Sequence, residues 1–588
     1  MMQRETLCNT LAHHDGSPLY VADPAPELGR RVEVFARTAD TLGVTRVHVR
    51  TSPDGEPHFT EALIDRKAEG ETWWRASIEM VNPECGYRFL LHTARGPLWL
   101  TAAGLSRIEV TDAADFTLAA YPPPPAWAAD AVIYQIFPDR FARGCPEAQV
   151  LPDWARPAEW EEPIPYGRPE ALQQIYGGDL WGVADRLGHI TDLGANLIYL
   201  TPFFPARSNH RYDASTFDRV DPLLGGDEAL KALVDRAHDQ GVRVIGDITL
   251  NHSGDAHDWF VEARAEEGSV ERDFYYFEGD DYATFAGVKS LPKFDHRAPE
   301  LRRRLDAVIA RYPAEFGLDG WRVDVAQSAG RHGDVELNGQ VARETRAALG
   351  EEHLLLAEHQ FDASAALRGD GWHGTMSYAG FARPVWSWLA RERSDEFWGT
   401  PGPIPQYGGQ DVAQVMRSYA SRIPWRSYTH SLTLLDSHDT ARFRSVAGRD
   451  HQHLGAALLF TMPGLPMVFA GDEVGVEGVH LEDGRRPFPW DGAWDQETYR
   501  IYRELAALRG SREALRRGGL RWLHADDDVV LFERAVPGEA LVVQVSRAGH
   551  APVLAPCELA GLLGAPDLNA GEPIPADGPA FHIWEVVR

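Results

Sequence analysis

Short apolar runs alternate with amphipathic helical segments along the middle of the chain. Helical patterns such as those at 181–195 and 227–241 each precede an apolar run that reads as a buried strand. Repeated pairs of this kind predict a parallel sheet, and about eight of them predict a closed α/β barrel of the (β/α)8 type. Seven strands are placed with ease, at residues 131–141, 196–204, 242–252, 318–327, 353–359, 432–439 and 465–473. The remaining strand is expected before Leu432, and GWHGTMSY at 371–378 is the candidate.

Shorter β-rich runs separated by turn residues flank this region on both sides. RVEVFARTA and YRFLLHTARG lie before the four consecutive prolines Pro122–Pro125, which predict a stiff domain boundary. RWLHADDDVVLFERA and EALVVQVSR lie near the C-terminus. The segment between His252 and Asp295 is too long for an ordinary loop of such a barrel. The predicted division is an N-terminal β-sandwich at 1–120, a barrel at 121–508 with an inserted excursion at about 252–295, and a C-terminal β-sandwich at 509–588.

Composition narrows the possible partners. The 588 residues carry a formal net charge of −29, which argues against nucleic acid and anionic membranes because both require a basic surface. No apolar run is long enough for a membrane span, and the N-terminus has no apolar stretch typical of a signal peptide. The four cysteines, Cys8, Cys85, Cys145 and Cys557, are scattered without a CxxC pair. We therefore expect a cytoplasmic protein with reduced thiols, as a monomer or homodimer.

Four of the predicted strands end in polar side chains that an apolar run does not need. In a parallel barrel, groups at the carboxyl ends of strands face one mouth. For any one strand alone, a salt bridge or a cap is the better explanation, but four strands together indicate a site. The residues concerned are Asp247, Asn251 and His252, then Arg322 and Asp324, then Glu358, and finally His438 and Asp439.

Cleavage of a glycosidic bond is the chemistry that uses such a set. It requires two carboxyls in different protonation states at one pH. Arg322 and Asp324 point to the same face of their strand, so we expect the cation to keep Asp324 ionised as a nucleophile. Glu358 follows an apolar run, so we expect weak solvation to raise its pKa, as a general acid needs.

These motifs resemble the α-amylase superfamily, glycoside hydrolase family 13. DITLNH, GWRVDVAQ, AEH and LLDSHD resemble its four signature regions in order and spacing. SLPKFD and YQIFPDRFARG are similar to the branch that contains neopullulanase, cyclomaltodextrinase and maltodextrin glucosidase, and LDSHDTARF and RRPFPW most resemble the last. The resemblance covers nearly the whole chain from about residue 20.

The resemblance implies a role for each site residue. Asp324 is expected to be the nucleophile, Glu358 the acid/base and Asp439 the third catalytic carboxylate. The residues expected to bind and orient the sugar are Tyr212, His210, His252, Arg322, His438 and Arg485. Asp247 and Asn251 are expected to be structural. The N-terminal domain resembles carbohydrate-binding module family 34.

The chain also departs from the family pattern. Relatives often carry a calcium-binding loop after the first strand, but here only Asp139 and Asp179 remain as oxygen ligands, too few for that ion. We therefore expect no required cofactor and no metal site. Calcium binding is possible, but its usual ligands are depleted. Leu481 stands where many relatives have an Asp that grips the second donor-side sugar. Glu482 or Asp483 could substitute if the loop shifts; otherwise a donor site without a strong second subsite favours removal of one glucose at a time. Gln327, Ser328 and Ala357 also differ from the usual residues.

The expected substrate is a maltooligosaccharide. We predict retaining hydrolysis of α-1,4-glucosidic bonds that releases glucose, as in a maltodextrin glucosidase, with transglycosylation as a side reaction. A cyclomaltodextrinase or neopullulanase activity is the alternative within the family. A non-catalytic carbohydrate-binding protein is the alternative of another class.

Overall fold

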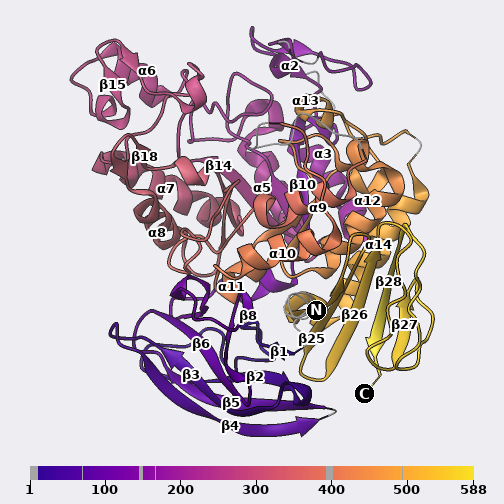
Figure 1. The fold of residues 1–588 in the computed structure, drawn as a ribbon. Helices are drawn as coiled ribbons and strands as arrows, with labels where there is room; N and C mark the ends of the chain where they lie inside the picture. The colour runs from indigo at the N-terminus through magenta and orange to yellow at the C-terminus, as the bar shows by residue number, and fades with distance from the viewer. Residues whose placement is uncertain are drawn as a thin grey trace.

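The computed structural model describes residues 11–68, 70–144, 150–165, 167, 169–391, 402–492 and 494–587. Cys8 and Cys145 lie outside these residues, and within them Cys85 and Cys557 form no disulfide bond. A central barrel carries an antiparallel sheet at each end of the chain (Figure 1). Among the described residues, no helix is long and apolar enough to cross a membrane.

Eight parallel strands form the barrel and confirm the predicted fold. They are β10 (Ile133–Ile136), β13 (Leu197–Leu200), β14 (Arg243–Thr249), β17 (Gly320–Asp324), β20 (Leu354–Ala357), β21 (Gly374–Thr375), β22 (Leu432–Leu434) and β23 (Leu465–Phe469). The hydrogen-bonded order is β21-β20-β17-β14-β13-β10-β23-β22. A parallel bridge between Met376 and Leu432 closes the ring. The strand at 371–378 is therefore present, although it is only two residues long.

Helices surround the strands on the outside. They are α3 (Leu180–Asp185), α4 (Leu187–Leu193), α5 (Gly226–Asp239), α7 (Pro299–Phe316), α8 (Asn338–Leu349), α9 (Arg383–Leu389), α10 (Gly409–Ala420), α11 (Trp425–Thr429), α12 (Phe443–Thr461) and α14 (Gln496–Ser511). The connection from β20 to β21 contains no α-helix. The helical signal that normally announces the next strand is absent there, so β21 is hard to find from sequence.

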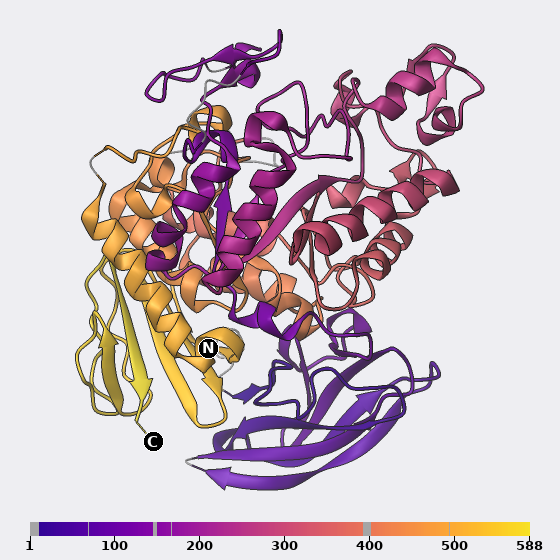
Figure 2. The same cartoon turned by 180° about the vertical axis from the view of Figure 1, so that it is seen from behind.

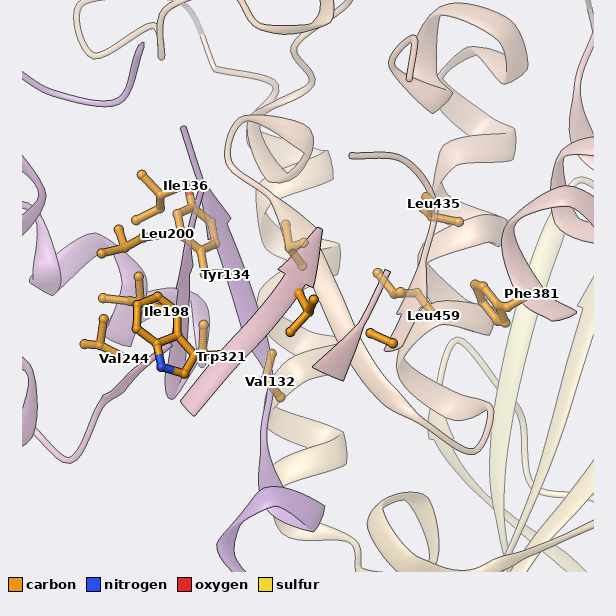
Figure 3. Close-up of a cluster of buried hydrophobic side chains, with 14 of the residues drawn as sticks. Val132, Tyr134, Ile136, Ile198, Leu200, Val244, Trp321, Phe381, Leu435 and Leu459 are labelled. Carbon is orange, nitrogen blue, oxygen red and sulfur yellow. The ribbon is translucent and has the colours of Figure 1, made fainter. Parts of the chain in front are cut away.

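Alternation along each strand separates the barrel interior from the layer under the helices. Tyr134, Ile198 and Val244 point outward and pack in the large cluster beneath the helices (Figure 3). Ile133 and Tyr199 point inward and belong to a separate interior cluster. Both faces are buried, which is why these strands read as continuous apolar runs.

The predicted excursion is a small subdomain that leaves and rejoins the barrel at one place. It contains α6 (Asp258–Ala265) and the short pair β15 (Phe277–Glu278) and β16 (Asp281–Tyr282), which stand off the barrel in Figure 1. The N–H of Phe294 donates to the carbonyl of Asn251, at 3.0 Å. His252 and Lys293 form a bridge beside it. The two ends of the excursion therefore lie side by side.

The N-terminal domain is one antiparallel sheet that folds over itself. Its strands are β1 (Ala12–His13), β2 (Arg31–Ala39), β3 (Val44–Thr51), β4 (His58–Ala68), β5 (Glu71–Glu79), β6 (Glu84–Thr93), β7 (Gly96–Thr101), β8 (Gly104–Ser106) and β9 (Phe116–Ala119). The first half of β4 pairs with β3 and its second half with β5. Val34 and Trp74 from one half share a core with Val47 and Phe89 from the other, as in a sandwich.

The C-terminal domain is a single antiparallel sheet with both faces covered. Its strands are β24 (Gly519–Ala525), β25 (Val529–Val536), β26 (Glu539–Ser546), β27 (Leu559–Leu563) and β28 (Ala580–Val586). Phe532 and Val543 face the barrel helices, whereas Leu531 and Trp584 pack under Ala555 and its neighbours. The domain limits at 120 and 508 stay predictions, although α14 runs across the second of them.

The two terminal sheets lie side by side below the barrel (Figure 2). A closed ring of four charged side chains joins them. Arg37 and Glu71 come from the N-terminal sheet, and Arg521 and Glu533 come from the C-terminal sheet. Each arginine lies 3.0–3.4 Å from both glutamates. Burial alone would raise the pKa of Glu533, but the charges of Arg521 and Arg37 outweigh it and lower this pKa to about 2.

We expect Glu533→Gln to destabilise the protein at neutral pH by about 3 kcal/mol, because it leaves buried arginine charge uncompensated. A carboxyl with a depressed folded-state pKa stabilises the fold above its unfolded pKa of about 4.3, and this stabilisation is lost as pH falls toward 2. The difference between variant and wild type should therefore shrink between about pH 5 and pH 2. Urea unfolding at several pH values measures it, with the exposed Glu56→Gln as control. A pH-independent difference would contradict the assignment.

Candidate active site

The predicted strand-end residues meet at one mouth of the barrel. Asp324 is the last residue of β17 and lies opposite Thr249 of β14. Glu358 follows β20 directly, and the pairing of Val323 with Ala357 sets it beside Asp324. Both carboxyls are buried, with 7% of Asp324 and 2% of Glu358 exposed. The convergence that the sequence pattern predicts is therefore present.

Arg322 is the centre of this cluster. Its side chain is fully buried, and its Nη1 lies 2.9 Å from Asp247 Oδ2 and 3.1 Å from Asp324 Oδ1. Its Nη2 lies 3.0 Å from Glu358 Oε2 and 4.0 Å from Asp439 Oδ2. One guanidinium is thus shared by four carboxyls, and the planar group fixes their relative positions.

The expected pKa pattern of the carboxyl pair is wrong in direction for Asp324. Burial and the charge of nearby Glu358 raise the pKa of Asp324 well above its usual range, and Arg322 offsets this only in part. Asp247, which the sequence treats as structural, competes for the same guanidinium. The charges of several neighbouring groups, and not Arg322 alone, therefore determine how readily Asp324 ionises.

Glu358 accepts two hydrogen bonds. The Val325 N–H donates to Oε2 at 2.7 Å, and the amide of Gln360 donates to Oε1 at 2.8 Å. Val325 has φ 33°, an unusual conformation for a β-branched residue. This turn directly after Asp324 aims the N–H at Glu358. Neither Val325 nor Gln360 carries a sequence signal that identifies it.

A second wall of the mouth is formed by the loop after β13. The hydroxyl of Tyr212 lies 2.8 Å from Asp247 Oδ2 and 2.5 Å from His438 Nε2. The Tyr212 N–H donates to Nδ1 of His210. Between them, Arg211 has φ 62°, and its guanidinium is tied to Asp221. Strain of this kind is common at functional sites, and here it turns two rings toward the mouth.

The excursion contributes Phe285, which lies in none of the quoted motifs, and Lys293, which lies in SLPKFD but has no predicted role. The ring of Phe285 stacks on His252, with centroids 5.2 Å apart and planes 7° apart. His252 Nε2 in turn faces Asp324 Oδ2 at 3.9 Å. Burial lowers the pKa of His252 to about 3, so this ring is neutral. Lys293 donates to Asn251 Oδ1 and to the carbonyl of Ser328, which ties the excursion to the loops after β14 and β17.

The remaining predicted residues line the side of the mouth near β22. Nη2 of Arg485 lies 3.2 Å from Asp439 Oδ1, and its Nε donates to the carbonyl of His438. Leu481 begins the short helix α13 (Leu481–Gly484). In this arrangement both oxygens of Asp483 are engaged, because they accept from the N–H of Val479 and from Arg486.

The two candidate calcium ligands near the loop after the first strand, whose residues 145–149 lie outside the described part of the chain, are both occupied. Asp139 accepts from the backbone N–H groups of Tyr176 and Gly177, and Asp179 accepts from those of Gly144 and Gly182. Carboxylates that are occupied by donors are poor cation ligands. Within the described part of the chain, no group of three His, Cys, Asp or Glu side chains is arranged to hold a metal. That the protein needs no calcium stays a prediction.

Barrel, carboxyl cluster and shared arginine together define a glycoside hydrolase. Residues 135–522 match the model of the alpha-amylase catalytic domain, so the chain belongs to the alpha-amylase family, glycoside hydrolase family 13. It is 34% identical over 447 residues to a cyclomaltodextrinase of Geobacillus thermopakistaniensis, covering 73% of this chain and 70% of that one. Neopullulanase 2 of Thermoactinomyces vulgaris is 31% identical over 565 residues, 91% of each chain. A solved cyclomaltodextrinase superposes with a TM-score of 0.74 at 25% identity, covering 98% and 100% of the two chains.

Proposed function

We propose that this protein hydrolyses α-glucosidic bonds in cyclic and linear maltodextrins with retention of configuration. The observation that carries the proposal is the grouping of Asp324, Glu358 and Asp439 around Arg322 at the barrel mouth. Glu358 and Asp324 lie against different nitrogens of one guanidinium, which favours the short carboxyl separation of about 5 Å that retaining enzymes need.

The proposed reaction is a double displacement. Glu358 donates its proton to the glycosidic oxygen as Asp324 attacks the anomeric carbon, which gives a β-linked glycosyl-enzyme and releases the shortened chain. Glu358 then removes a proton from water, the water attacks the same carbon, and Asp324 leaves. The first step requires the proton on Glu358, next to the glycosidic oxygen, and an ionised Asp324.

The activity that we favour differs from the glucose release that the sequence predicts. The relatives named above are cyclomaltodextrinases and a neopullulanase, so a ring-opening or maltose-releasing activity is better supported. Phe285 over His252 supports it as well, because an apolar ring at the mouth suits the curved apolar face of a glucan. Release of single glucose units remains the second candidate, supported by Leu481 and by the engagement of Asp483. A cytoplasmic location and a monomeric or dimeric state belong to the proposal.

Product analysis separates these candidates. Purified protein is incubated with β-cyclodextrin, maltoheptaose and pullulan, and early products are followed by anion-exchange chromatography. We expect β-cyclodextrin to be opened faster than maltoheptaose is cut, with maltose as the main final product and the α-anomer first by proton NMR. Glucose as the sole early product from maltoheptaose would favour the second candidate.

Asp324→Asn protein, purified in parallel, controls for contaminating amylase. Absence of products from all three substrates would overturn the enzymatic proposal and favour a carbohydrate-binding protein. Release of the β-anomer first would overturn retention.

A further inference from the structure

We infer that Gln135 is a positioning residue that fixes the tautomer of His438 and so directs its Nε2 proton into the sugar-binding site. Gln135 lies on β10 with its side chain fully buried, on the interior face of the barrel shared with Ile133. Its amide makes two contacts with one residue. The backbone N–H of His438 donates to Oε1 of Gln135 at 3.2 Å, and Nε2 of Gln135 lies 3.0 Å from Nδ1 of the His438 ring.

These two contacts determine where the imidazole proton lies. A backbone N–H can only donate, so the atom of the Gln135 side chain that faces it must be the carbonyl oxygen. The amide nitrogen then faces Nδ1 and donates to it. A neutral imidazole that accepts at Nδ1 carries its proton on Nε2. The Nε2 proton is therefore available to the Tyr212 hydroxyl at 2.5 Å and to Asp439 Oδ2 at 3.3 Å.

The surroundings keep the ring neutral and so make the tautomer matter. Burial and the charges of Arg485 and Arg322 lower the pKa of His438 well below its usual value. A neutral ring has one proton to place, unlike an imidazolium with two. The titratable or charged groups that face it, or lie next to those that do, are Arg322 from β17, Asp439 from its own loop, Arg485, Tyr212, His210 and, through Tyr212, Asp247.

The inference rests on the proposed function, because a sugar hydroxyl is the group that the Nε2 proton would meet. A sugar hydroxyl that lies within reach of both His438 and Asp439 can accept from Nε2–H and donate to the carboxylate at once. With the proton on Nδ1 instead, Nε2 and Asp439 would both be acceptors, and one hydroxyl could not satisfy both. Gln135, which does not touch the sugar in this arrangement, would thus act through His438.

The tautomer is measured directly on the whole protein without substrate, by nitrogen NMR of ¹⁵N-histidine-labelled samples. The His438 signals are identified by their loss in His438→Gln. We expect the wild-type ring at pH 7 to carry its proton on Nε2, with Nδ1 unprotonated. In Gln135→Met, which removes the donor, both tautomers should be populated. A wild-type ring protonated on Nδ1 would overturn the inference.

Gln135→Glu supplies a kinetic test that distinguishes control of the His438 tautomer from a purely structural role. When protonated, the new carboxyl can donate to Nδ1 and accept from the His438 N–H, as the amide does. When ionised by rising pH, it becomes an acceptor and draws the imidazole proton to Nδ1. Activity should therefore be close to wild type at low pH and lost on the alkaline side, whereas Gln135→Met should lose about 100-fold in kcat/KM at every pH.

The sign of the pH shift is the discriminating result. A purely Coulombic effect of the added negative charge would raise the pKa values of the catalytic carboxyls and move the whole profile upward instead. An unchanged or upward-shifted profile for Gln135→Glu would overturn the inference. Gln544→Glu, an equally buried glutamine in the C-terminal sheet, is the matched control and should leave the profile unchanged. A wild-type protein without activity would remove the proposed function, yet the NMR result would still decide the tautomer.

Discussion

Asp324→Asn is expected to lower kcat/KM for maltodextrin hydrolysis by on the order of 10⁴-fold or more, while leaving the fold intact. The amide keeps the size of the side chain and its place at the end of β17 but cannot form the glycosyl-enzyme. Steady-state kinetics on maltotriose and β-cyclodextrin measure the loss. Because Asn can hydrolyse slowly to Asp, Asp324→Ala is measured alongside.

Asp319 offers a matched control on the same chain segment. It is 7% exposed, as Asp324 is, and it pairs with His238 and Arg243 just before the first residue of β17. Asp319→Asn should lower stability without lowering kcat by more than a few-fold. Azide gives a second reading, because with Asp324→Ala it would attack an α-glycosyl fluoride directly and produce the β-glycosyl azide. Activity of Asp324→Asn within 10-fold of wild type, against the expected loss of about 10⁴-fold, would remove Asp324 as the nucleophile.

Glu358→Gln should lower kcat/KM on natural substrates by about 10³-fold, since a general acid contributes roughly 10²- to 10⁴-fold. The loss should depend on the leaving group. A 4-nitrophenyl α-maltoside needs little protonation, so its first step should be nearly unaffected and a burst of nitrophenolate should appear. Stopped-flow absorbance at 400 nm, or a similar wavelength, detects that burst.

Azide should then accelerate turnover of Glu358→Gln and yield the α-glycosyl azide, since it opens a β-linked intermediate from the opposite face. Glu473→Gln is the control. Glu473 is also fully buried, but it hydrogen-bonds Tyr134 and His189 on the outer side of the barrel. Equal losses on natural and activated substrates, without azide acceleration, would argue that Glu358 serves the fold rather than proton transfer.

The sequence alone locates the barrel and the carboxyl cluster because both depend on local patterns. Strand after strand is a buried apolar run that ends in polar residues, and the register of a parallel sheet brings those ends together. Prediction is weakest at β21, where a two-residue strand follows a connection without an α-helix. Its position depends on the closing contact of Met376 with Leu432, which no local pattern encodes.

Electrostatics was predicted less well than geometry. Arg322 and Asp324 are neighbours on one strand, so a simple ion pair was expected. In the fold, Asp247 and Glu358 also contact the guanidinium of Arg322. Burial has the largest effect on the pKa of Asp324 and raises it. The pKa of a buried group depends on all charges around it, most of which come from distant parts of the chain.

Phe285 could not be identified from sequence, and Lys293 of SLPKFD could not be given a role, for a similar reason. Both lie in the excursion, whose path over the barrel is set by its own small core, including Phe260 and Tyr275. Phe285 is 39 positions before Asp324 and has no fixed geometric relation to it until that path is known. Gln135 was hidden differently, inside a strand whose neighbours are all apolar.

The adjacency of the two ends of the excursion has a consequence for how such enzymes can be altered. A segment that departs and returns at one point can be lengthened, shortened or exchanged without displacing the strands that bear the carboxyls. The junction for such an exchange is the hydrogen bond from the Phe294 N–H to the Asn251 carbonyl, and the bridged pair His252 and Lys293 would be retained. Residues 253–292 could then be exchanged as one unit, which would alter the preference among glucans without altering the carboxyl cluster at the strand ends.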